Sequence, residues 1–275
     1  MNWIEVKATF DSGQDLSPYV DIFGEYGIEN TLEEGASLTG CLVSVDGSAE
    51  RIEELAAALT TAGAREVTTR DLAEDNWEIA WRQFFKPRRI GTRFLVRPTW
   101  EEAEPAPDDL VIVLDPGQAF GTGDHPTTRL CLELMEGVQI AGRRVLDVGC
   151  GSGILSVGAC LLGAKKVMAI DIDPIAVEVA KENRDLNQVQ FDAAVGEGLD
   201  GLKGDWDVAI SNIISATLVR IACDVRDVLV DGGRWVVSGV IVDNWPDVLM
   251  AAEKAGFRFV EKREEDGWVA ASFTC

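Results

Sequence analysis

"LDVGCGSG", residues 146–153, places three glycines at alternate positions directly after an apolar run and directly before a helical pattern. Glycines there let the backbone turn tightly and approach a ligand closely, and the start of the helix offers unpaired N–H groups. The glycines give GxGxG, whereas the dinucleotide fingerprint GxGxxG has its third glycine one position later. The stretch predicts a strand, a ligand-contacting turn and a helix; the alternative is a glycine turn needed only for packing.

From residue 143 onward, apolar strands alternate with helices. Strands are expected at RRVLDVG, KKVMAIDID, VQFDAAV, WDVAISN and RWVVSGVIV, and helices over 154–163, 174–187 and near 216–230. Strands that are apolar along their whole length are buried on both faces, which predicts a doubly wound α/β domain with a parallel sheet. Residues 257–275 predict an antiparallel hairpin through Asp266-Gly267. Such an edge hairpin is unusual for a dinucleotide dehydrogenase and usual for one large class of methyltransferases.

The first seventy residues predict a separate small domain. Their pattern is strand, helix, two strands, helix, strand, with Pro18 in the first turn of the first helix and Gly27 past its end. This order is typical of a ferredoxin-like α+β fold. We therefore expect a recognition or assembly domain over 1–70, a connector with a short aromatic helix over 71–92, and a catalytic domain over 93–275.

The composition is that of an acidic globular protein, with 47% apolar residues, 26% charged residues and a formal net charge of −22. No apolar run approaches the roughly 20 residues of a membrane span. The N-terminus lacks the basic start and apolar segment of a secretory signal, so we expect a cytoplasmic protein.

The negative charge bears on possible partners. It disfavours stable nucleic-acid binding, because phosphate binding relies on lysine and arginine. A basic protein partner fits better, although acidity can simply maintain solubility. The basic segment from Arg82 to Arg97 could touch RNA or lie against acidic neighbours in the same molecule, and the second alternative is favoured.

The six cysteines and the single histidine form no metal-binding pattern. The cysteines show no CxxC pair, and one histidine leaves little for a zinc site. We expect free thiols in a reducing compartment and no metal site.

A carboxylate follows the second strand of the predicted parallel sheet. Asp171 stands twenty-two residues after Gly149, where it can accept hydrogen bonds from both ribose hydroxyls of an adenosine. The missing dinucleotide spacing, the acidic Asp147 and the terminal hairpin favour S-adenosylmethionine, whose positive charges tolerate nearby carboxylates. We therefore expect S-adenosylmethionine as the cofactor.

Asn212 ends the fourth strand of this sheet. Its amide oxygen could accept an N–H of a substrate near the methyl group, or the residue could only cap the next helix. Its place at the carboxyl end of the strand, where open α/β sheets bind ligands, favours a catalytic role.

"FGTGDHPTTRL", residues 120–130, contains the only histidine of the chain. It does not follow the nucleotide-binding strand, so we expect a lid over the cofactor rather than a phosphate cradle. His125 precedes Pro126 at the start of a helix, which favours a loop anchor over a catalytic base.

Several segments together resemble the PrmA family, the methyltransferases of the eleventh large-subunit ribosomal protein. They are DPGQAFGTGDHPTTRLCLELME, DVGCGSGILS, AIDIDPIAVEVAKEN and SNIISATL, preceded by WEIAWRQFFKPRRIG. The resemblance runs from about residue 77 to the C-terminus in local sequence, and extends to the N-terminal part by domain order.

The resemblance implies a bacterial cytoplasmic enzyme with a class I S-adenosylmethionine-dependent methyltransferase domain, and we expect a monomer. It implies methylation of lysine side chains and the N-terminal amine of that basic ribosomal protein, which the small N-terminal domain recognises. The implied cofactor contacts are Thr128, Gly149, Gly151, Asp171 and Asn212, with Phe120 in the loop that closes over the cofactor. Asn212 is the expected catalytic residue.

The sequence departs from the family pattern at two places. Asp124 stands where the family usually has threonine, and SNIISATL replaces the more usual ANILAGPL, so the target-side pocket can differ. The alternatives are a related methyltransferase acting on another protein or a small amine, and a non-catalytic nucleotide-binding module. A nicotinamide oxidoreductase fits least well.

Overall fold

The computed structural model describes most of the chain as two compact units, Met1–Phe84 and Phe85–Cys275. The described residues are 3–11, 14, 16–28, 31–43, 48–72, 85–115, 123, 125–196, 199 and 205–275. The aromatic helix expected within the connector, EDNWEIAWRQFFKP at residues 74–87, lies outside the described residues as far as residue 84, and residues 85–87 are not helical. Each unit has its own hydrophobic core and is described by itself.

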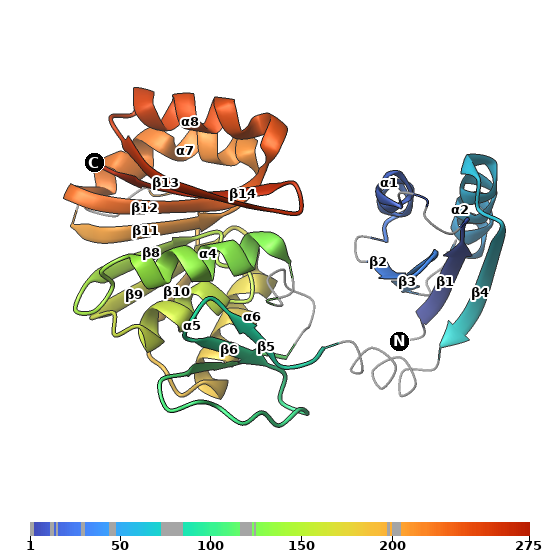
Figure 1. Cartoon of the computed structure of the whole chain (residues 1–275), viewed down its shortest axis with the longest axis horizontal. Coiled ribbons are helices and arrows are strands. Elements are labelled where there is room, and N and C mark those ends of the chain that lie inside the picture. Colours follow the sequence, from blue (N-terminus) through green and yellow to red (C-terminus); the bar gives the residue numbers. More distant parts are fainter. Residues whose placement is uncertain are drawn as a thin grey trace. The chain divides into compact units, whose positions relative to one another are not determined.

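The first unit is a four-stranded antiparallel sheet with two helices packed on one face (Figure 1). Its elements are β1 (Trp3–Thr9), α1 (Ser17–Glu25), β2 (Thr31–Glu34), β3 (Ser37–Val43), α2 (Ser48–Ala62) and β4 (Glu66–Leu72). The strand order β2-β3-β1-β4 puts the first strand beside the last, and all neighbouring strands are antiparallel. Phe23 of α1 and Leu55 and Leu59 of α2 are buried against the sheet. The predicted ferredoxin-like fold is confirmed.

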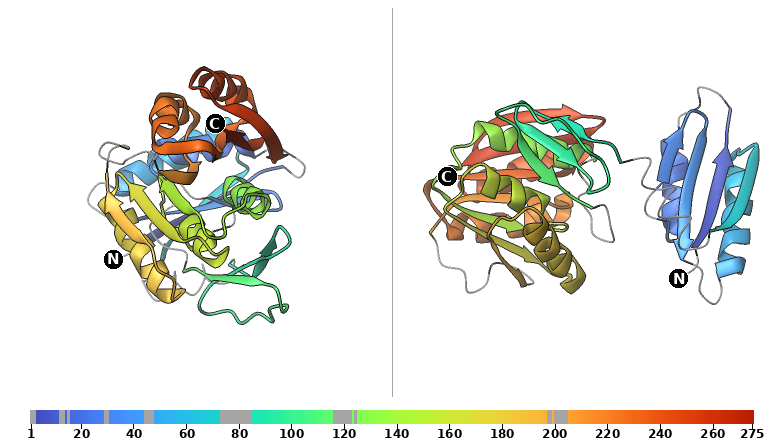
Figure 2. Two further views of the ribbon diagram at one scale, coloured as in Figure 1. Left: turned by 90° about the vertical axis from the view of Figure 1, so that its left-hand side faces the viewer. Right: turned by 90° about the horizontal axis from the view of Figure 1, so that it is seen from below.

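The second unit is built on a seven-stranded sheet (Figure 2). Its order is β10-β9-β8-β11-β12-β14-β13, in which the strands from β10 to β12 are parallel. The strands are β8 (Arg144–Val148), β9 (Lys166–Asp171), β10 (Asp192–Val195), β11 (Trp206–Asn212), β12 (Leu229–Ile241), β13 (Arg258–Glu265) and β14 (Trp268–Thr274). Strand β14 is antiparallel to both of its neighbours, and the turn at Asp266 and Gly267 has positive φ at both residues. The doubly wound sheet and its terminal hairpin are confirmed.

Helices cover both faces of this sheet and bury two separate clusters of apolar side chains. The helices α4 (Pro126–Gly137), α5 (Ile154–Leu161) and α6 (Pro174–Leu186) pack on one face, and α7 (Ser215–Val228) and α8 (Trp245–Lys254) on the other. Successive residues of β12 alternate between the faces: Val236 belongs to the first cluster and Val237 to the second. We call the face that carries α4 the α4 face.

In the seven-stranded sheet and its covering helices, three elements differ from the sequence-based expectation. Helix α8 was not predicted; it follows β12 after the single turn η1 (Val242–Asn244) and has Pro246 in its first turn. Strand β12 begins at Leu229, five residues before the expected start. Strand β10 begins at Asp192 rather than Val189, because Phe191 is buried against the α4 face before the strand begins. The pattern of apolar residues marked the two strands but not where they begin.

A small three-stranded sheet completes the second unit. It contains β5 (Arg88–Ile90), β6 (Phe94–Arg97) and β7 (Leu110–Val113); strands were expected at RFLVRPTW and DDLVIVLDP, but none was expected at β5. In its basic segment, Lys86 pairs with Glu101 at 2.5 Å and Arg89 with Asp109 at 2.6 Å. The basic segment therefore lies against acidic neighbours of the same molecule, as the sequence analysis favoured over contact with RNA.

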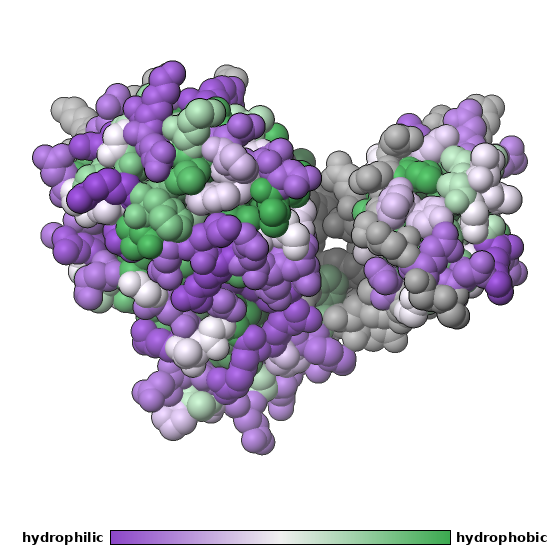
Figure 3. Space-filling view, turned by 45° about the horizontal axis from the view of Figure 1, so that its top comes forward, coloured by the Kyte–Doolittle hydropathy of each residue, from purple (hydrophilic) through white to green (hydrophobic). Residues whose placement is uncertain are grey.

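The face that Figure 3 shows is mostly hydrophilic, with hydrophobic side chains in small separate areas. Within the described part of the chain, no helix is both long enough and apolar enough to cross a membrane.

Candidate functional site

The glycine turn after β8 has the backbone geometry that requires glycine. Gly149, Gly151 and Gly153 all have positive φ, at 77°, 52° and 78°. The N–H groups of Gly149 and Cys150 both donate to the carbonyl oxygen of Ile170, at 2.8 and 3.1 Å. This bond pair ties the turn to β9. A Cβ at position 149 would lie 2.3 Å from Cγ2 of Ile213, so the turn has no room for a side chain.

Asp171 lies at the end of β9 with its carboxylate fixed by the backbone. Its Oδ2 accepts the N–H of Gly151 at 2.9 Å, and its Oδ1 accepts the N–H of Asp173 at 3.0 Å. Each carboxylate oxygen has further lone-pair capacity. The geometry therefore leaves Asp171 able to accept hydroxyl groups while it holds the glycine turn.

Asp147 is a buried carboxylate just before this turn. Its side chain is 0% exposed, and Oδ2 accepts the hydroxyl of Ser156 at 2.6 Å. Burial raises the pKa of the carboxyl to about 7, and the nearby charge of Asp171 also raises it, although the Ser156 bond opposes the shift. Oδ1 has no hydrogen-bond partner. A buried acceptor of this kind fits a cationic or N–H group of a ligand.

Asn212 is the last residue of β11, and the nitrogen of its side-chain amide makes a hydrogen bond. Its Nδ2 donates to Oγ1 of Thr128 at 3.4 Å, and Thr128 is fully buried in the first turn of α4. Among the described residues, Oδ1 of Asn212 and Oδ1 of Asp147 are the buried side-chain polar atoms without a partner. Asn212 does not cap the next helix, because the N-cap of α7 is Ile214. The amide oxygen is therefore available to an N–H of a ligand.

His125 is the N-cap residue of α4. Its Nδ1 accepts the N–H of Thr127 at 3.3 Å and lies 2.7 Å from Oγ1 of the same residue. Burial lowers the pKa of the imidazole, and the nearby charge of Arg129 lowers it further. The capping nitrogen must be unprotonated to accept, so a neutral ring suits this role. This geometry fits a loop anchor.

The structure brings five of the six expected cofactor residues together at the carboxyl ends of the central strands. They are Thr128, Gly149, Gly151, Asp171 and Asn212. Phe120 and the unusual Asp124 lie outside the described residues. Gly123 is described: it is buried with φ of 88°, and a Cβ there would lie 3.0 Å from Cγ1 of Val96.

Sequence analysis missed two exposed isoleucines at this edge. Ile172 directly follows Asp171 and is 71% exposed, and Ile214 follows Asn212 by two positions and is 68% exposed. An aliphatic residue just after a polar one at a strand end is the signal that could have found them. They add apolar surface beside the polar site. Groups of residues that could hold a metal ion are absent from the part of the chain that the structure describes.

The ionisation of Asp147 predicts a pH dependence of stability. Its pKa is about 7 in the folded protein and about 3.9 in an unfolded chain. The unfolded chain therefore releases the proton first as pH rises, and the folded state loses up to about 4 kcal/mol between about pH 4 and pH 7. The Asp147→Asn variant lacks this titration. In urea melts across this range, the free energy of unfolding of the wild type should fall relative to that of the variant as the pH rises; parallel curves would contradict the assignment.

The site lies at the point where the strand order reverses. From β8 the chain runs to β9 and β10 on one side, and it continues with β11 and β12 on the other side of β8. Ligands of open α/β sheets bind at this point, outside the carboxyl ends of the strands. Numbered by chain order within this seven-stranded sheet, the strands lie in the order third, second, first, fourth, fifth, seventh and sixth. With the glycine turn after the first strand and the carboxylate after the second, this architecture defines a class I S-adenosylmethionine-dependent methyltransferase.

The chain belongs to the family described as "Ribosomal protein L11 methyltransferase (PrmA)", which it matches over residues 8–275. It is 41% identical over 230 residues to the ribosomal protein L11 methyltransferase of Bacillus velezensis, covering 82% of this chain and 74% of that protein. The enzyme of the same name from Herpetosiphon aurantiacus is 33% identical over 315 residues, with 98% of each chain covered.

A solved structure also resembles the chain. The ribosomal protein L11 methylase from Lactobacillus delbrueckii subsp. bulgaricus superposes with a TM-score of 0.64 at 30% identity, covering 69% of this chain and 98% of that one. The resemblance to the PrmA family is thereby confirmed.

Proposed function

We propose that the chain transfers methyl groups from S-adenosylmethionine to ribosomal protein L11, at lysine side chains and the N-terminal amine. The observation that carries this proposal is the buried, unpartnered amide oxygen of Asn212, held in place by Thr128. It fits an amine N–H at the edge of the sheet where the cofactor residues meet. The names of the related proteins support the identity of the substrate.

The residues at this edge fit S-adenosylmethionine. Asp171 can hold the ribose hydroxyls, Gly149 and Gly151 allow the backbone to approach the ligand, and the unpaired Oδ1 of Asp147 suits the cationic methionine end. Thr128, in the first turn of α4, lies beside the Asn212 amide. The cofactor supplies an electrophilic methyl group when it is bound.

The protein must orient a neutral amine and exclude water from it. The nitrogen has to approach to about 3 Å in line with the bond that breaks. The Asn212 oxygen accepts one amine N–H and so directs the lone pair of the nitrogen. Desolvation at this edge lowers the pKa of a lysine amine, which favours the neutral form. A strong general base is therefore unnecessary, and His125 remains a helix cap.

We further assign substrate recognition to residues 1–70, catalysis to residues 93–275 and a connecting role to residues 71–92. The separate core of the first unit supports an independent recognition module. Residues 1–70 contain thirteen acidic and four basic residues, a charge that suits a basic ribosomal protein. We place the enzyme in the cytoplasm as a monomer without stable nucleic-acid binding; the bacterial relatives and the net charge of −22 support this assignment.

Mass spectrometry of ribosomal protein L11 after incubation with the enzyme and S-adenosylmethionine tests the proposal. We expect mass increments of whole methyl groups on lysines and the N-terminus, and none with the cofactor omitted. Labelled methyl that enters another protein or a small amine instead of L11 would favour the related-methyltransferase alternative. Cofactor binding without any transfer would favour a non-catalytic module.

A further inference from the structure

A bulge in β12 turns extra side chains toward the α4 face beyond Asn212. Val237 pairs with Ala271 and Val240 with Val269, so two residues of β12 face one residue of β14. Gly239, with φ of 83°, lies in this bulge. Bulges change which side chains point to a face of a sheet. Ser238 and Ile241 therefore both point to the α4 face, although they are an odd number of residues apart.

Trp268 shares this face as the cross-strand partner of Ile241. Val240 and Val269, the pair next to them, belong to the core of the opposite face, which places Ile241 and Trp268 on the α4 side. The ring of Trp268 meets the ring of His125 edge to face, with 4.9 Å between centroids. Trp268 is partly exposed, and Ile241 is 42% exposed.

The first turn of α4 links this pair to Asn212. His125 contacts Trp268, and Thr128, three positions later, contacts the amide of Asn212. Residues three apart on a helix lie on the same side of it. Asn212 is level with Ser238, and Trp268 lies two residues of β14 beyond that level, about 7 Å further out along the strands. This offset along the strands is comparable with the length of an extended lysine side chain; across the sheet, β12 lies between β11 with Asn212 and β14 with Trp268.

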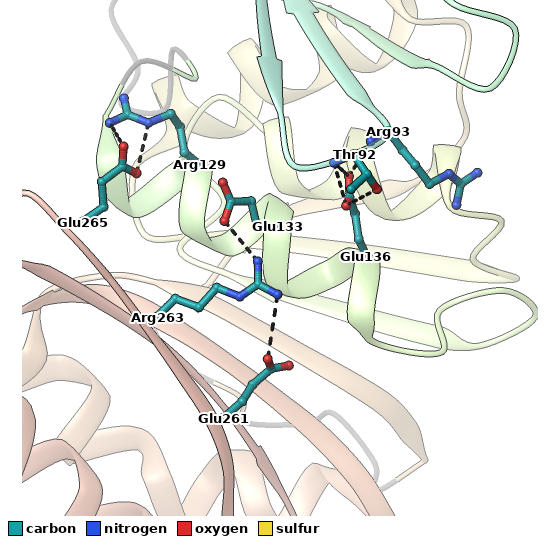
Figure 4. Close-up of polar contacts among 8 residues, drawn as sticks. All are labelled: Thr92, Arg93, Arg129, Glu133, Glu136, Glu261, Arg263 and Glu265. Carbon is teal, nitrogen blue, oxygen red and sulfur yellow. Dashed lines mark hydrogen bonds and ion pairs between the residues drawn. The ribbon is translucent and has the colours of Figure 1, made fainter.

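Ion pairs fix the hairpin on α4, so Trp268 has a defined position. Figure 4 shows Arg129 of α4 binding Glu265 at 2.7 Å, and Arg263 of β13 binding Glu133 of α4 at 3.1 Å. Further along α4, the carboxylate of Glu136 accepts the N–H groups of Thr92 and Arg93. The helix is thus held to the hairpin at one end and to the turn between β5 and β6 at the other.

We propose that Trp268 and Ile241 form the wall of the acceptor site, packing on the methylene stem of the lysine whose nitrogen Asn212 holds. This assignment rests on the proposed function. The chemistry agrees with the surfaces: an aromatic ring and an aliphatic side chain suit four methylenes, and the amide oxygen suits the amine. Glu265 and Asp266 at the hairpin tip share Arg129 as their ion-pair partner, so one net negative charge is left where a cationic lysine would enter.

Steady-state kinetics of the full-length enzyme with ribosomal protein L11 test the wall. Trp268→Ala should lower kcat/KM for L11 about tenfold, because it removes the apolar contact with the stem. The Kd for S-adenosylmethionine, measured by calorimetry, should stay within about twofold, and Trp268→Phe should restore most of the activity. Trp245→Phe is the matched control, since Trp245 packs on Phe273 in the core of the opposite face. Ile241→Ala removes little buried surface and should lower kcat/KM about threefold.

Tryptophan fluorescence gives a second measurement that needs no turnover. In the complex with S-adenosylhomocysteine, L11 should protect one tryptophan from acrylamide quenching in the wild type and in Trp245→Phe, but not in Trp268→Phe. Equal protection in all three proteins, or unchanged kcat/KM in both Trp268→Ala and Ile241→Ala, would overturn the assignment. A wild-type enzyme that does not methylate L11 at all would instead contradict the proposed function.

Discussion

Replacing Asn212 by alanine is expected to lower kcat for methyl transfer by about 100-fold or more, the size of effect found when one positioned hydrogen-bonding group is removed from an active site. The structure gives the reason: Thr128 engages the amide nitrogen, so the buried oxygen is oriented and has no other partner. Alanine leaves the amine without its acceptor. Rapid-quench measurement of labelled methyl transfer under saturating cofactor checks the rate.

Asn244→Ala is the matched control for this experiment. Asn244 is also an asparagine on the second unit, but its amide donates to Ser215 at 3.0 Å, between η1 and α7. The control should keep kcat near the wild-type value. Calorimetry with S-adenosylmethionine separates loss of amine orientation from loss of the cofactor contact that the family resemblance implies for Asn212. Turnover at the wild-type rate in Asn212→Ala would remove Asn212 from the mechanism.

Gly239→Ala is expected to destabilise the second unit by about 3 kcal/mol or more. A Cβ at this position would lie 2.3 Å from the carbonyl oxygen of Ile213 and 2.7 Å from its carbonyl carbon. These are backbone atoms of the segment that directly follows Asn212, so no side-chain rotation relieves the clash. The positive φ of 83° adds conformational strain for a residue with a side chain. The free energy of unfolding from urea melts, followed by tryptophan emission, measures the change.

Gly232→Ala separates the cost of the clash with Ile213 from the cost of the positive φ. Gly232 lies in the same strand with a similar φ of 78°, but a Cβ there would meet nothing within 4 Å. We expect this control to lose only about 1 kcal/mol, the cost of the backbone conformation. Equal losses in the two variants would show that the contact with Ile213 contributes nothing. A Gly239→Ala protein that still folds should also transfer methyl more slowly, because the shifted backbone carries Asn212.

Local signals explain which features could be predicted. The glycine turn, the carboxylate of Asp171 and the Asp266-Gly267 hairpin each depend on residues close together in the chain, and φ above zero or a strand end can be inferred from a few neighbours. The ferredoxin-like order of the first unit followed in the same way. Helix α8, which begins at Trp245 with Pro246 in its first turn, was not predicted.

Long-range contacts explain the rest. Asn212 and Thr128 are 84 positions apart, Arg129 and Glu265 are 136 apart, and the burial of Asp147 needs the packing of α5 against β8. No pattern in the sequence shows which amide oxygen is left without a partner. The bulge at Gly239 likewise depends on how β12 pairs with β14.

The sequence by itself determined the class of fold, the family and the residue types at the strand ends, because these depend on local periodicity, turn chemistry and shared motifs. Only the tertiary structure decided what those residues do to one another. It made His125 a helix cap, left one oxygen each of Asp147 and Asn212 buried and unpaired, and set Trp268 beside the first turn of α4. The physical reason is that burial and hydrogen-bond satisfaction are properties of the packed sheet and its helices, which no single segment contains.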